Sequence, residues 1–285
     1  MEYTIELPGS QPVISLRELL ESQWLIPRKV RHFLRIRKNV RINGEFAQFQ
    51  QEVHPGDQIT LLLQEDDYSY QPVSLGNAAK IRPLYEDKHL IVVDKPAGIK
   101  THPNQPEEVG TLLNDLAAYL EKSGQRPYVV HRLDKETSGA ILFAKNPLVL
   151  PILGRLLEEK QIYRRYQAIV AGSLAENMTI AKKIGRDRHD RRKRVIDERG
   201  GQPAVTHVEV VSHSQKESRI FCVLDTGRTH QIRVHLAAIG HPILGDPLYN
   251  PRRSQGRLQL HAYQMILKHP FTEQTLKLTA APGLW

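Results

Sequence analysis

The sequence has very little cysteine, since Cys222 is the only one among 285 residues. A single cysteine cannot form a disulfide within the chain, and a cysteine-based zinc site needs several. Cys222 lies among apolar residues in the stretch RIFCVL, which is typical of a packed strand residue rather than a nucleophile. The shortage of cysteine therefore favours a reducing, cytoplasmic location and argues against cysteine-dependent catalysis.

Several other signals are missing. No apolar run approaches the roughly 20 residues that a membrane span needs, and the N-terminus lacks the basic and apolar regions of a secretory signal. The glycine-rich patterns of dinucleotide and P-loop sites are absent, as is HExxH. His230 and His235 lack the spacing that places two ligands on one helix face. We therefore expect no cofactor, no metal and no membrane contact.

Acidic residues are missing from one long stretch, 26–41, which reads IPRKVRHFLRIRKNVR and carries part of the net charge of +9. Its apolar residues recur at helical spacing, which predicts a helix with one buried and one positive face. A solvated helix face is the plain alternative. We instead expect the phosphates of a nucleic acid to bind four of its basic residues, Arg28, Lys29, Arg31 and Arg35.

The residues around this stretch indicate a small module. Leu16, Leu19 and Leu20 predict a short helix with Ser15 as its N-cap, and Asn43-Gly44 predicts a hairpin. The polar stretch that follows lacks periodicity and is interpreted as a linker. We expect a small α+β domain at 1–65, a linker at 66–80 and a larger domain at 81–285.

The larger domain mixes strands and helices without a regular βαβ rhythm, which predicts an α+β fold with a mixed, largely antiparallel sheet. Strands are expected at 90–93 and 140–144, and helices at 111–121 and from Asn146-Pro147 onward, with Asn146 as N-cap. The stretch 182–200 has nine basic and four acidic residues and is predicted to be an exposed, mobile loop. THQIRVHLAAIG predicts a short helix closed by Gly240.

Charge is densest in HRLDKETSG, residues 131–139. Its Asp134 is flanked by Arg132 and Lys135, and an ionised carboxylate can act as a nucleophile or a base. The alternative is that Asp134 only caps the following turn. Farther along, Arg228 and Arg233 lie near a predicted helix start, a place that suits anions.

Four ordered motifs resemble the RluA/RluD-type pseudouridine synthases: YEDKHLIVVDKPAGIKTHP, HRLDKETSGAILFAK, RRYQAIVAG and LDTGRTHQIRVHLAAIGHPILGDPLY. The resemblance covers roughly residues 81–280. More weakly, the first 65 residues resemble the alpha-L RNA-binding domain. The resemblance implies a pseudouridine synthase fold and an enzyme that isomerises uridine within RNA without cofactor or metal.

The resemblance also implies residue roles. Asp134 matches the catalytic aspartate, and attack on the sugar, attack on the base and removal of a sugar proton all stay open for it. Tyr166 matches the tyrosine that stacks on uracil and assists loss of the carbon-five proton. Arg233 matches the aspartate's basic partner, and Arg132 matches the arginine that fills the space of the flipped base. His131 and Arg228 are expected to bind substrate, and Lys95, Pro96 and Gly98 to give structural support.

The expected partner is RNA, with ribosomal RNA first and transfer RNA as the alternative. We expect a cytoplasmic monomer. Two rival functions are a base-excising glycosidase, which would release free uracil, and a non-catalytic RNA-binding or ribosome-assembly protein with an inert synthase fold.

Overall fold

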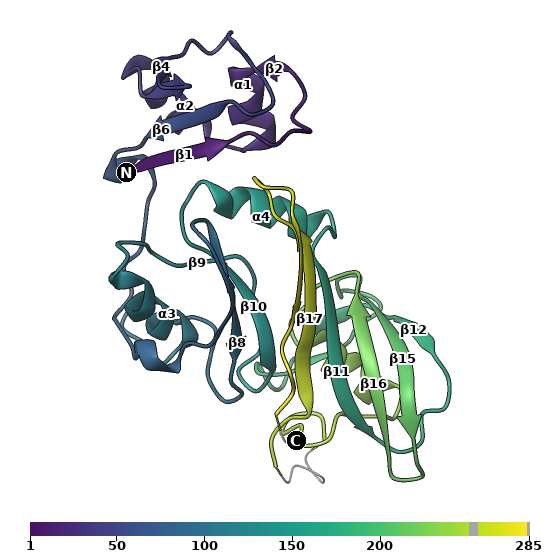
Figure 1. Ribbon diagram of the computed structural model, residues 1–285. Coiled ribbons are helices and arrows are strands. Elements are labelled where there is room, and N and C mark those ends of the chain that lie inside the picture. The colour runs from purple at the N-terminus through teal and green to yellow at the C-terminus, as the bar shows by residue number, and fades with distance from the viewer. Residues whose placement is uncertain (251–255, 284–285) are drawn as a thin grey trace.

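The computed structural model describes residues 1–250 and 256–283. Its N-terminal part forms a four-stranded antiparallel sheet, with strand order β1-β6-β3-β4 (Figure 1). These strands span Glu2–Glu6, Gln58–Leu62, Val40–Ile42 and Glu45–Phe46. A short ribbon of β2 (Ile14–Ser15) and β5 (Glu52–Val53) lies beside it.

The N-terminal helices follow the sequence pattern. Ser15 caps α1 (Leu16–Glu18) by accepting a hydrogen bond from the Glu18 N–H, and a π-helical turn continues through Leu19–Gln23. The basic stretch forms α2 (Arg28–Ile36), which buries Val30 and Leu34. Asn43-Gly44 joins β3 to β4 with positive φ angles of 53° and 88°, as a tight hairpin turn requires. The predicted helices and hairpin are therefore confirmed.

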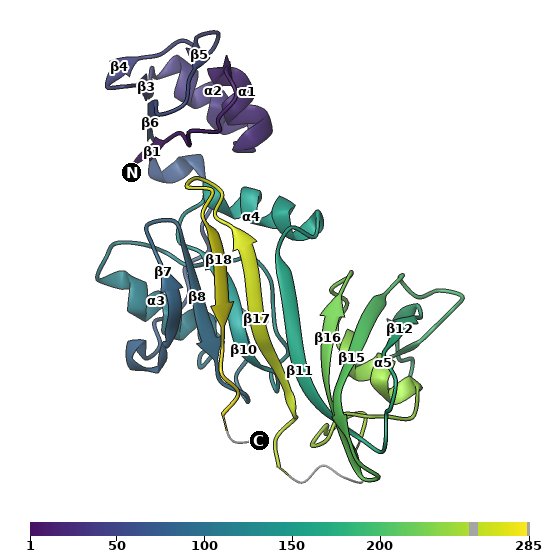
Figure 2. The ribbon, with the colours of Figure 1, turned by 45° about the vertical axis from the view of Figure 1, so that its right-hand side comes forward.

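The N-terminal core is continuous with that of the larger part of the chain. Trp24 meets Phe271 edge to face, with ring centroids 5.6 Å apart. Arg155 on α4 (Val149–Glu158) donates to the backbone oxygens of Ser22 and Gln23 at 2.5 and 2.9 Å. The N-terminal part thus sits at the end of the sheet where α4 and the β17–β18 turn lie (Figure 2).

The stretch predicted as a linker is fastened to the protein rather than free. It contains two 3₁₀ turns, Glu65–Asp67 and Ala78–Lys80. Asn114 donates to the Ser74 carbonyl at 2.7 Å, and the Asn77 N–H donates to the Asp115 carboxylate at 2.7 Å. Both partners belong to α3 (Leu112–Glu121), which begins at the capping Thr111. The division into 1–65, 66–80 and 81–285 is kept as a proposal, and the last residues of its final segment lie outside the described ones.

A ten-stranded sheet forms the larger part, with main order β12-β15-β16-β11-β17-β10-β8-β7, β18 beside β17 and β9 beside β10. Among the described strands, β10 and β17 are its one parallel pair, which confirms the largely antiparallel prediction. The strands, in chain order from β7 to β12, span Pro83–Glu86, Leu90–Lys95, Tyr128–Val129, Ser138–Ala144, Tyr163–Ala171 and Met178–Ala181. From β15 to β18 they span Val205–His213, Glu217–Leu224, Leu260–Lys268 and Thr275–Thr279.

Two details refine the sequence predictions. The stretch 182–200 is not a loop throughout, because β13 (Ile184–Arg186) and β14 (Arg194–Ile196) pair as a hairpin whose Ile184 packs on Val234. Because charged residues dominate the composition of this stretch, the sequence does not indicate the short apolar contact of Ile184 with Val234. Helix α4 begins at Val149, two residues after the predicted start, although the Asn146 side chain still accepts from the Val149 N–H.

Two further predictions hold. Helix α5 (Gln231–Ala238) is closed by Gly240 at a φ of 84°. Cys222 is buried in β16, and burial raises the pKa of its thiol to about 12, which confirms a packing role. In the part of the chain that the structure describes, no helix is both long and apolar enough to cross a membrane.

Candidate active site

Asp134 and Tyr166 are anchored at the same point of β17. Gly139, just after the Asp134 loop, pairs with Ala262 on one side of β17, and Tyr166 pairs with Ala262 on the other. Gly139 has a φ of 110°, and a Cβ there would lie 2.3 Å from the Ala262 carbonyl oxygen, so only glycine allows this approach. The register of β11 against β17 shifts between Arg165 and Tyr166, an irregularity that re-aims side chains.

A buried lysine holds the Asp134 loop. Lys95 is fully buried, and its ammonium donates to the backbone oxygens of Pro96, Lys135 and Thr137 at 3.0, 3.1 and 2.7 Å. Burial lowers the pKa of Lys95 to about 8, against the attraction of Asp134 and Glu136. These contacts agree with the support expected of Lys95, because they fix the backbone on both sides of the loop.

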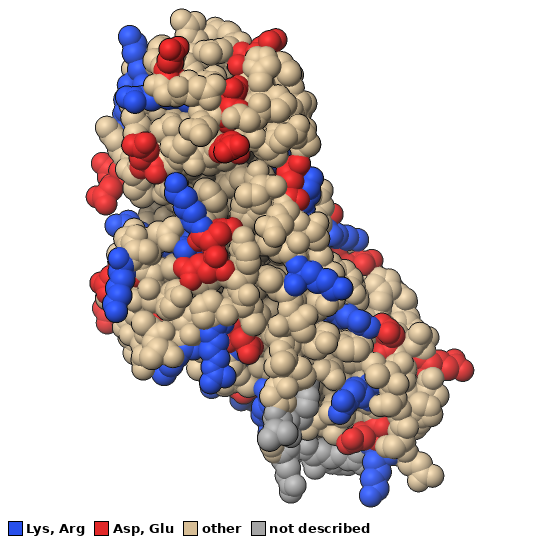
Figure 3. Space-filling model, in the orientation of Figure 1, with Lys and Arg blue, Asp and Glu red and all other residues tan. Residues whose placement is uncertain are grey.

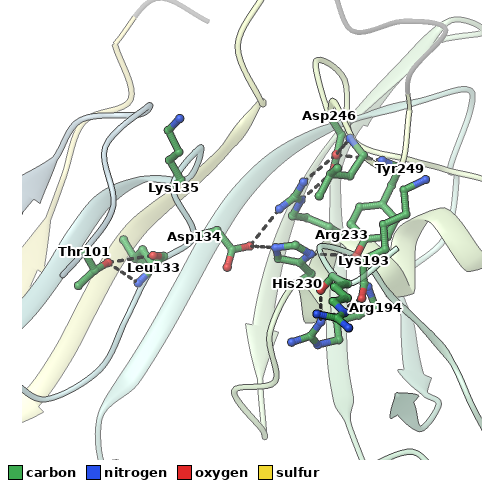
Figure 4. A network of polar contacts seen from close by, with 12 residues as sticks. Thr101, Leu133, Asp134, Lys135, Lys193, Arg194, His230, Arg233, Asp246 and Tyr249 are labelled. Atoms are coloured by element: carbon green, nitrogen blue, oxygen red, sulfur yellow. Dashed lines mark hydrogen bonds and ion pairs between the residues drawn. The ribbon is translucent and has the colours of Figure 1, made fainter. Parts of the chain in front are cut away.

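The Asp134 side chain points away from its own turn. The turn is closed by the backbone, with the Thr137 N–H donating to the Asp134 carbonyl at 3.1 Å. The carboxylate instead accepts from Arg233 Nη1 at 3.3 Å, through Oδ2. Capping, the plain alternative for this residue, therefore does not explain where its carboxylate lies (Figure 4).

Arg233 is held from behind by a second carboxylate. Its Nε and Nη2 donate to the two oxygens of Asp246, both at 2.8 Å, and Asp246 is completely buried. Burial disfavours the charged form of Asp246, but the hydrogen bonds and charge of Arg233 outweigh it and keep the pKa of Asp246 below its usual range. The guanidinium is thus fixed by a bidentate pair and offers Nη1 to Asp134.

Two further residues complete the polar network drawn in Figure 4. His230 Nε2 lies 3.7 Å from Asp134 Oδ2, and His230 Nδ1 lies 2.9 Å from the Tyr249 hydroxyl. The Tyr249 hydroxyl also accepts from the backbone N–H of Arg194 at 2.8 Å. The Asp134 loop is therefore linked to the β13–β14 hairpin through two side chains.

Asp134, His230 and Arg233 line a cleft of about 720 Å³, a size suited to a nucleotide. Tyr166 lines it and is buried. Burial raises the pKa of the Tyr166 hydroxyl, although Arg164 opposes the rise, so the hydroxyl stays protonated at neutral pH. The cleft therefore combines an aromatic ring, a carboxylate and cationic groups.

The other predicted substrate contacts differ in exposure. Arg132 is exposed at the cleft, and Arg228 lines it while its Nε donates to the Pro203 carbonyl at 3.2 Å. His131 is buried in the wall, where Nε2 accepts from the Leu142 N–H at 3.2 Å. Burial, helped by Arg164, lowers the pKa of His131 to about 3, so the ring is neutral. This geometry gives His131 a supporting contact, and substrate binding by it stays a prediction.

The basic helix α2 lies apart from this cleft, none of whose lining residues come from the N-terminal part. Arg28, Lys29 and Arg35 are exposed. Arg31 was expected to bind phosphate, but it forms an ion pair with Glu21 and its Nε donates to the Ile26 carbonyl at 3.0 Å. The acid comes from the preceding turn, outside the acid-free stretch, so Arg31 is already paired in the RNA-free protein, and phosphate binding by it stays a prediction.

Sequence reasoning missed three members of the network. Asp246 and Tyr249 occur in the motif that ends GHPILGDPLY, but nothing in their spacing shows that they meet Arg233 and His230. His230 was weighed only as a metal ligand. Its left-handed backbone, with a φ of 58°, is a structural signal that the sequence does not display.

The chain is similar to known proteins in sequence and in fold. Residues 89–238 match the model of the RNA pseudouridylate synthase family, and residues 3–59 match the N-terminal domain of RluD ribosomal pseudouridine synthase. The protein is 42% identical over 246 residues to Bacillus subtilis YhcT, described as an uncharacterized RNA pseudouridine synthase, with 84% of this chain and 80% of YhcT covered.

Two other proteins extend the comparison. Ribosomal large subunit pseudouridine synthase D of Neisseria meningitidis serogroup B is 38% identical over 258 residues, which cover 85% of this chain and 68% of that protein. The structure of human RNA pseudouridylate synthase domain containing 1 superposes with a TM-score of 0.61 at 27% identity, covering 74% of this chain and 86% of the human one. On the strength of the matched family model and these similarities, the chain belongs to the RNA pseudouridylate synthase family and is an RNA pseudouridine synthase.

Proposed function

We propose that the protein isomerises uridine to pseudouridine in ribosomal RNA, with Asp134 as its catalytic residue. The choice of ribosomal RNA is supported by relatives named ribosomal large subunit pseudouridine synthase D, at 38% and 36% identity, and by the N-terminal match. A cytoplasmic location and a monomeric state, both expected from the sequence, belong to the same proposal.

The observation that carries the assignment of Asp134 is its placement. Its carboxylate is only partly exposed, faces the cleft that Tyr166 lines and is paired with a buried guanidinium. The guanidinium of Arg233 holds the Asp134 carboxylate at the cleft, in a position suited to attack or to proton removal.

The target atoms of a uridine are inaccessible while its base is stacked, so the nucleotide must be flipped out at a cost of a few kcal/mol. The exposed Arg132, beside Asp134, suits the role of filling the vacated space and contacting phosphate. The ring of Tyr166 suits stacking on the displaced base, a contact worth about 1–3 kcal/mol. Because its hydroxyl is protonated, Tyr166 can take up the carbon-five proton only while passing its own proton on to another acceptor such as solvent.

The test uses ribosomal RNA transcripts carrying tritium at carbon five of uridine. Isomerisation releases tritium into water, whereas binding alone does not. We expect release by the wild-type protein and none by Asp134→Asn, which keeps the shape of the side chain and nearly unchanged RNA affinity. Turnover by Asp134→Asn at the wild-type rate would contradict the assignment of Asp134.

Two parallel assays separate the rival functions. Free uracil in the products would indicate a glycosidase, and tight binding without any tritium release would indicate a non-catalytic RNA-binding protein. Transfer RNA transcripts are assayed beside the ribosomal ones. Release from transfer RNA alone would overturn the proposed substrate and leave the assignment of Asp134 standing.

A further inference from the structure

His230 occupies an unusual backbone conformation in the wall of the cleft. Its φ of 58° and ψ of 19° lie in the left-handed region, immediately before α5. Residues other than glycine seldom adopt this region, and such conformations gather at functional sites. The conformation places the ring between Asp134 and Tyr249, with the side chain 13% exposed.

The hydrogen bonds around Tyr249 determine which ring nitrogen of His230 carries a proton. The Tyr249 hydroxyl accepts from the Arg194 backbone N–H, which can only donate. The hydroxyl proton is then free to be donated to His230 Nδ1, at 2.9 Å. A neutral imidazole that accepts at Nδ1 carries its proton on Nε2. Burial lowers the pKa of His230 although Asp134 opposes this, which favours the neutral ring.

Arg233 and His230 both approach the same oxygen of the Asp134 carboxylate. Arg233 Nη1 lies 3.3 Å from Oδ2 and His230 Nε2 lies 3.7 Å from it. Among the residues that the structure describes, none forms a hydrogen bond with Oδ1. The carboxylate, which lines the cleft, is therefore held through Oδ2.

We infer that His230 is a positioning residue for Asp134, with its Nε2–H, maintained by the Tyr249 hydroxyl, orienting the carboxylate so that Oδ1 meets the substrate. This inference rests on the proposed role of Asp134. The contact is longer than an ordinary hydrogen bond in the substrate-free protein, and catalytic contacts commonly tighten once substrate is bound.

Two replacements of His230 distinguish a positioning role from a merely conformational one, because the two roles predict opposite orders of activity for the two variants. The amide nitrogen of glutamine can lie where Nε2 lies, whereas the shorter asparagine reaches only the position of Nδ1. Asparagine, however, adopts the left-handed backbone more readily than glutamine does. A positioning role therefore predicts that His230→Gln is the better enzyme, and a backbone role predicts that His230→Asn is.

The measurement is the single-turnover rate of tritium release, together with RNA affinity and thermal unfolding. We expect His230→Asn to react about 10- to 100-fold more slowly, as when a hydrogen bond to a charged group is lost, with an RNA Kd within about twofold of wild type. His230→Gln should recover most of that rate. Equal or better activity of His230→Asn, or wild-type rates in both variants, would overturn the inference.

A second variant tests the link between Tyr249 and His230 in case substitutions at His230 disturb folding. Tyr249→Phe removes the hydroxyl and keeps the ring, whose centroid lies 5.1 Å from the Arg233 guanidinium carbon. We expect about a three- to tenfold slower reaction, the scale of one neutral hydrogen bond, with unchanged RNA affinity. Tyr119→Phe is the matched control. Tyr119 lies on α3, away from the cleft, and its hydroxyl donates to Glu86 at 2.9 Å.

A wild-type rate in Tyr249→Phe would overturn the link between Tyr249 and His230. Asp134→Asn is assayed beside these variants, so that the role of His230 and the role of Asp134 can be contradicted separately. If Asp134→Asn is inactive while the His230 and Tyr249 variants react normally, the positioning role alone is lost. If Asp134→Asn itself reacts, the proposed function of Asp134 is lost.

Discussion

Asp246 binds Arg233 through two hydrogen bonds of 2.8 Å each, and only the remaining nitrogen of the guanidinium reaches Asp134. The positive charge beside Asp134 is therefore not a flexible counter-ion. Its position is set by a buried acid, so the geometry of the cleft depends on a residue that faces away from it.

Removing that acid should destabilise the protein. Asp246→Ala leaves the buried charge of Arg233 with Asp134 alone, and the loss of one partner from a buried pair costs about 3–5 kcal/mol of unfolding free energy. Urea denaturation measures the loss. Lys268→Ala breaks the exposed pair with Glu273 and should cost less than about 1 kcal/mol. A loss for Asp246→Ala no larger than for Lys268→Ala would show that Asp246 does not support Arg233.

Tyr166→Phe should separate stacking from proton chemistry. The phenylalanine ring keeps the aromatic face, so the RNA Kd should remain within about twofold of wild type. The rate of tritium release should fall at least about tenfold, because acid–base catalysis typically contributes more than that. Filter binding and single-turnover assays measure the two quantities. A collapse of RNA affinity would mean that the hydroxyl, and not the ring, holds the base.

The basic helix can be tested through salt dependence. On the face shown in Figure 3, basic and acidic side chains are interspersed rather than gathered in one patch. Substituting Arg28, Lys29 and Arg35 together with glutamine should reduce the slope of log affinity against log salt by roughly 2, because each phosphate contact contributes about 0.7 to 0.9.

Arg31→Gln tests the fourth predicted contact separately, because Arg31 is engaged by Glu21 and should change the slope less than each of the three exposed residues does. An unchanged slope in the triple variant would show that α2 does not contact RNA. Point substitutions are preferable to deletion of residues 1–65, since the deletion would expose apolar residues such as Phe271.

The buried His131 should make stability depend on pH. Its pKa is about 3 in the folded protein against an ordinary 6.5. Between these values the unfolded chain binds a proton that the folded protein does not, so unfolding free energy falls as pH falls, by up to about 1.4 kcal/mol per pH unit from this residue. The contribution is complete above pH 6.5 and is lost progressively toward pH 3.

His131→Gln should flatten that decline, because glutamine can still accept from the Leu142 N–H but cannot be protonated. Denaturation at several pH values between 7 and 4 measures the slope. His32→Gln, which changes an exposed histidine on α2, should keep the wild-type slope. Equal slopes in the wild-type protein and His131→Gln would show that His131 is protonated while folded.

Much of the local structure could be predicted because short-range chemistry determines it. Ser15 and Thr111 cap their helices, Asn43-Gly44 closes a hairpin and Gly240 ends α5, all through contacts within a few residues. The hairpin of 184–196 was missed because its pairing depends on packing against Val234, which is remote in sequence. The start of α4 was placed too early because a turn intervenes after Asn146.

For the site, the sequence by itself determined the reactive loop and the pairing of Asp134 with Arg233, through motifs that resemble one family. Only the tertiary structure decided that Asp246 fixes Arg233, that His230 and Tyr249 join Asp134 to a distant hairpin, and that Arg31 is already paired. The physical reason is the separation along the sequence over which each interaction acts. Capping and turn formation act between neighbouring residues, whereas Asp134 and Arg233 are 99 positions apart and meet through tertiary contacts, among them the close approach of β10 to β17 at Gly139.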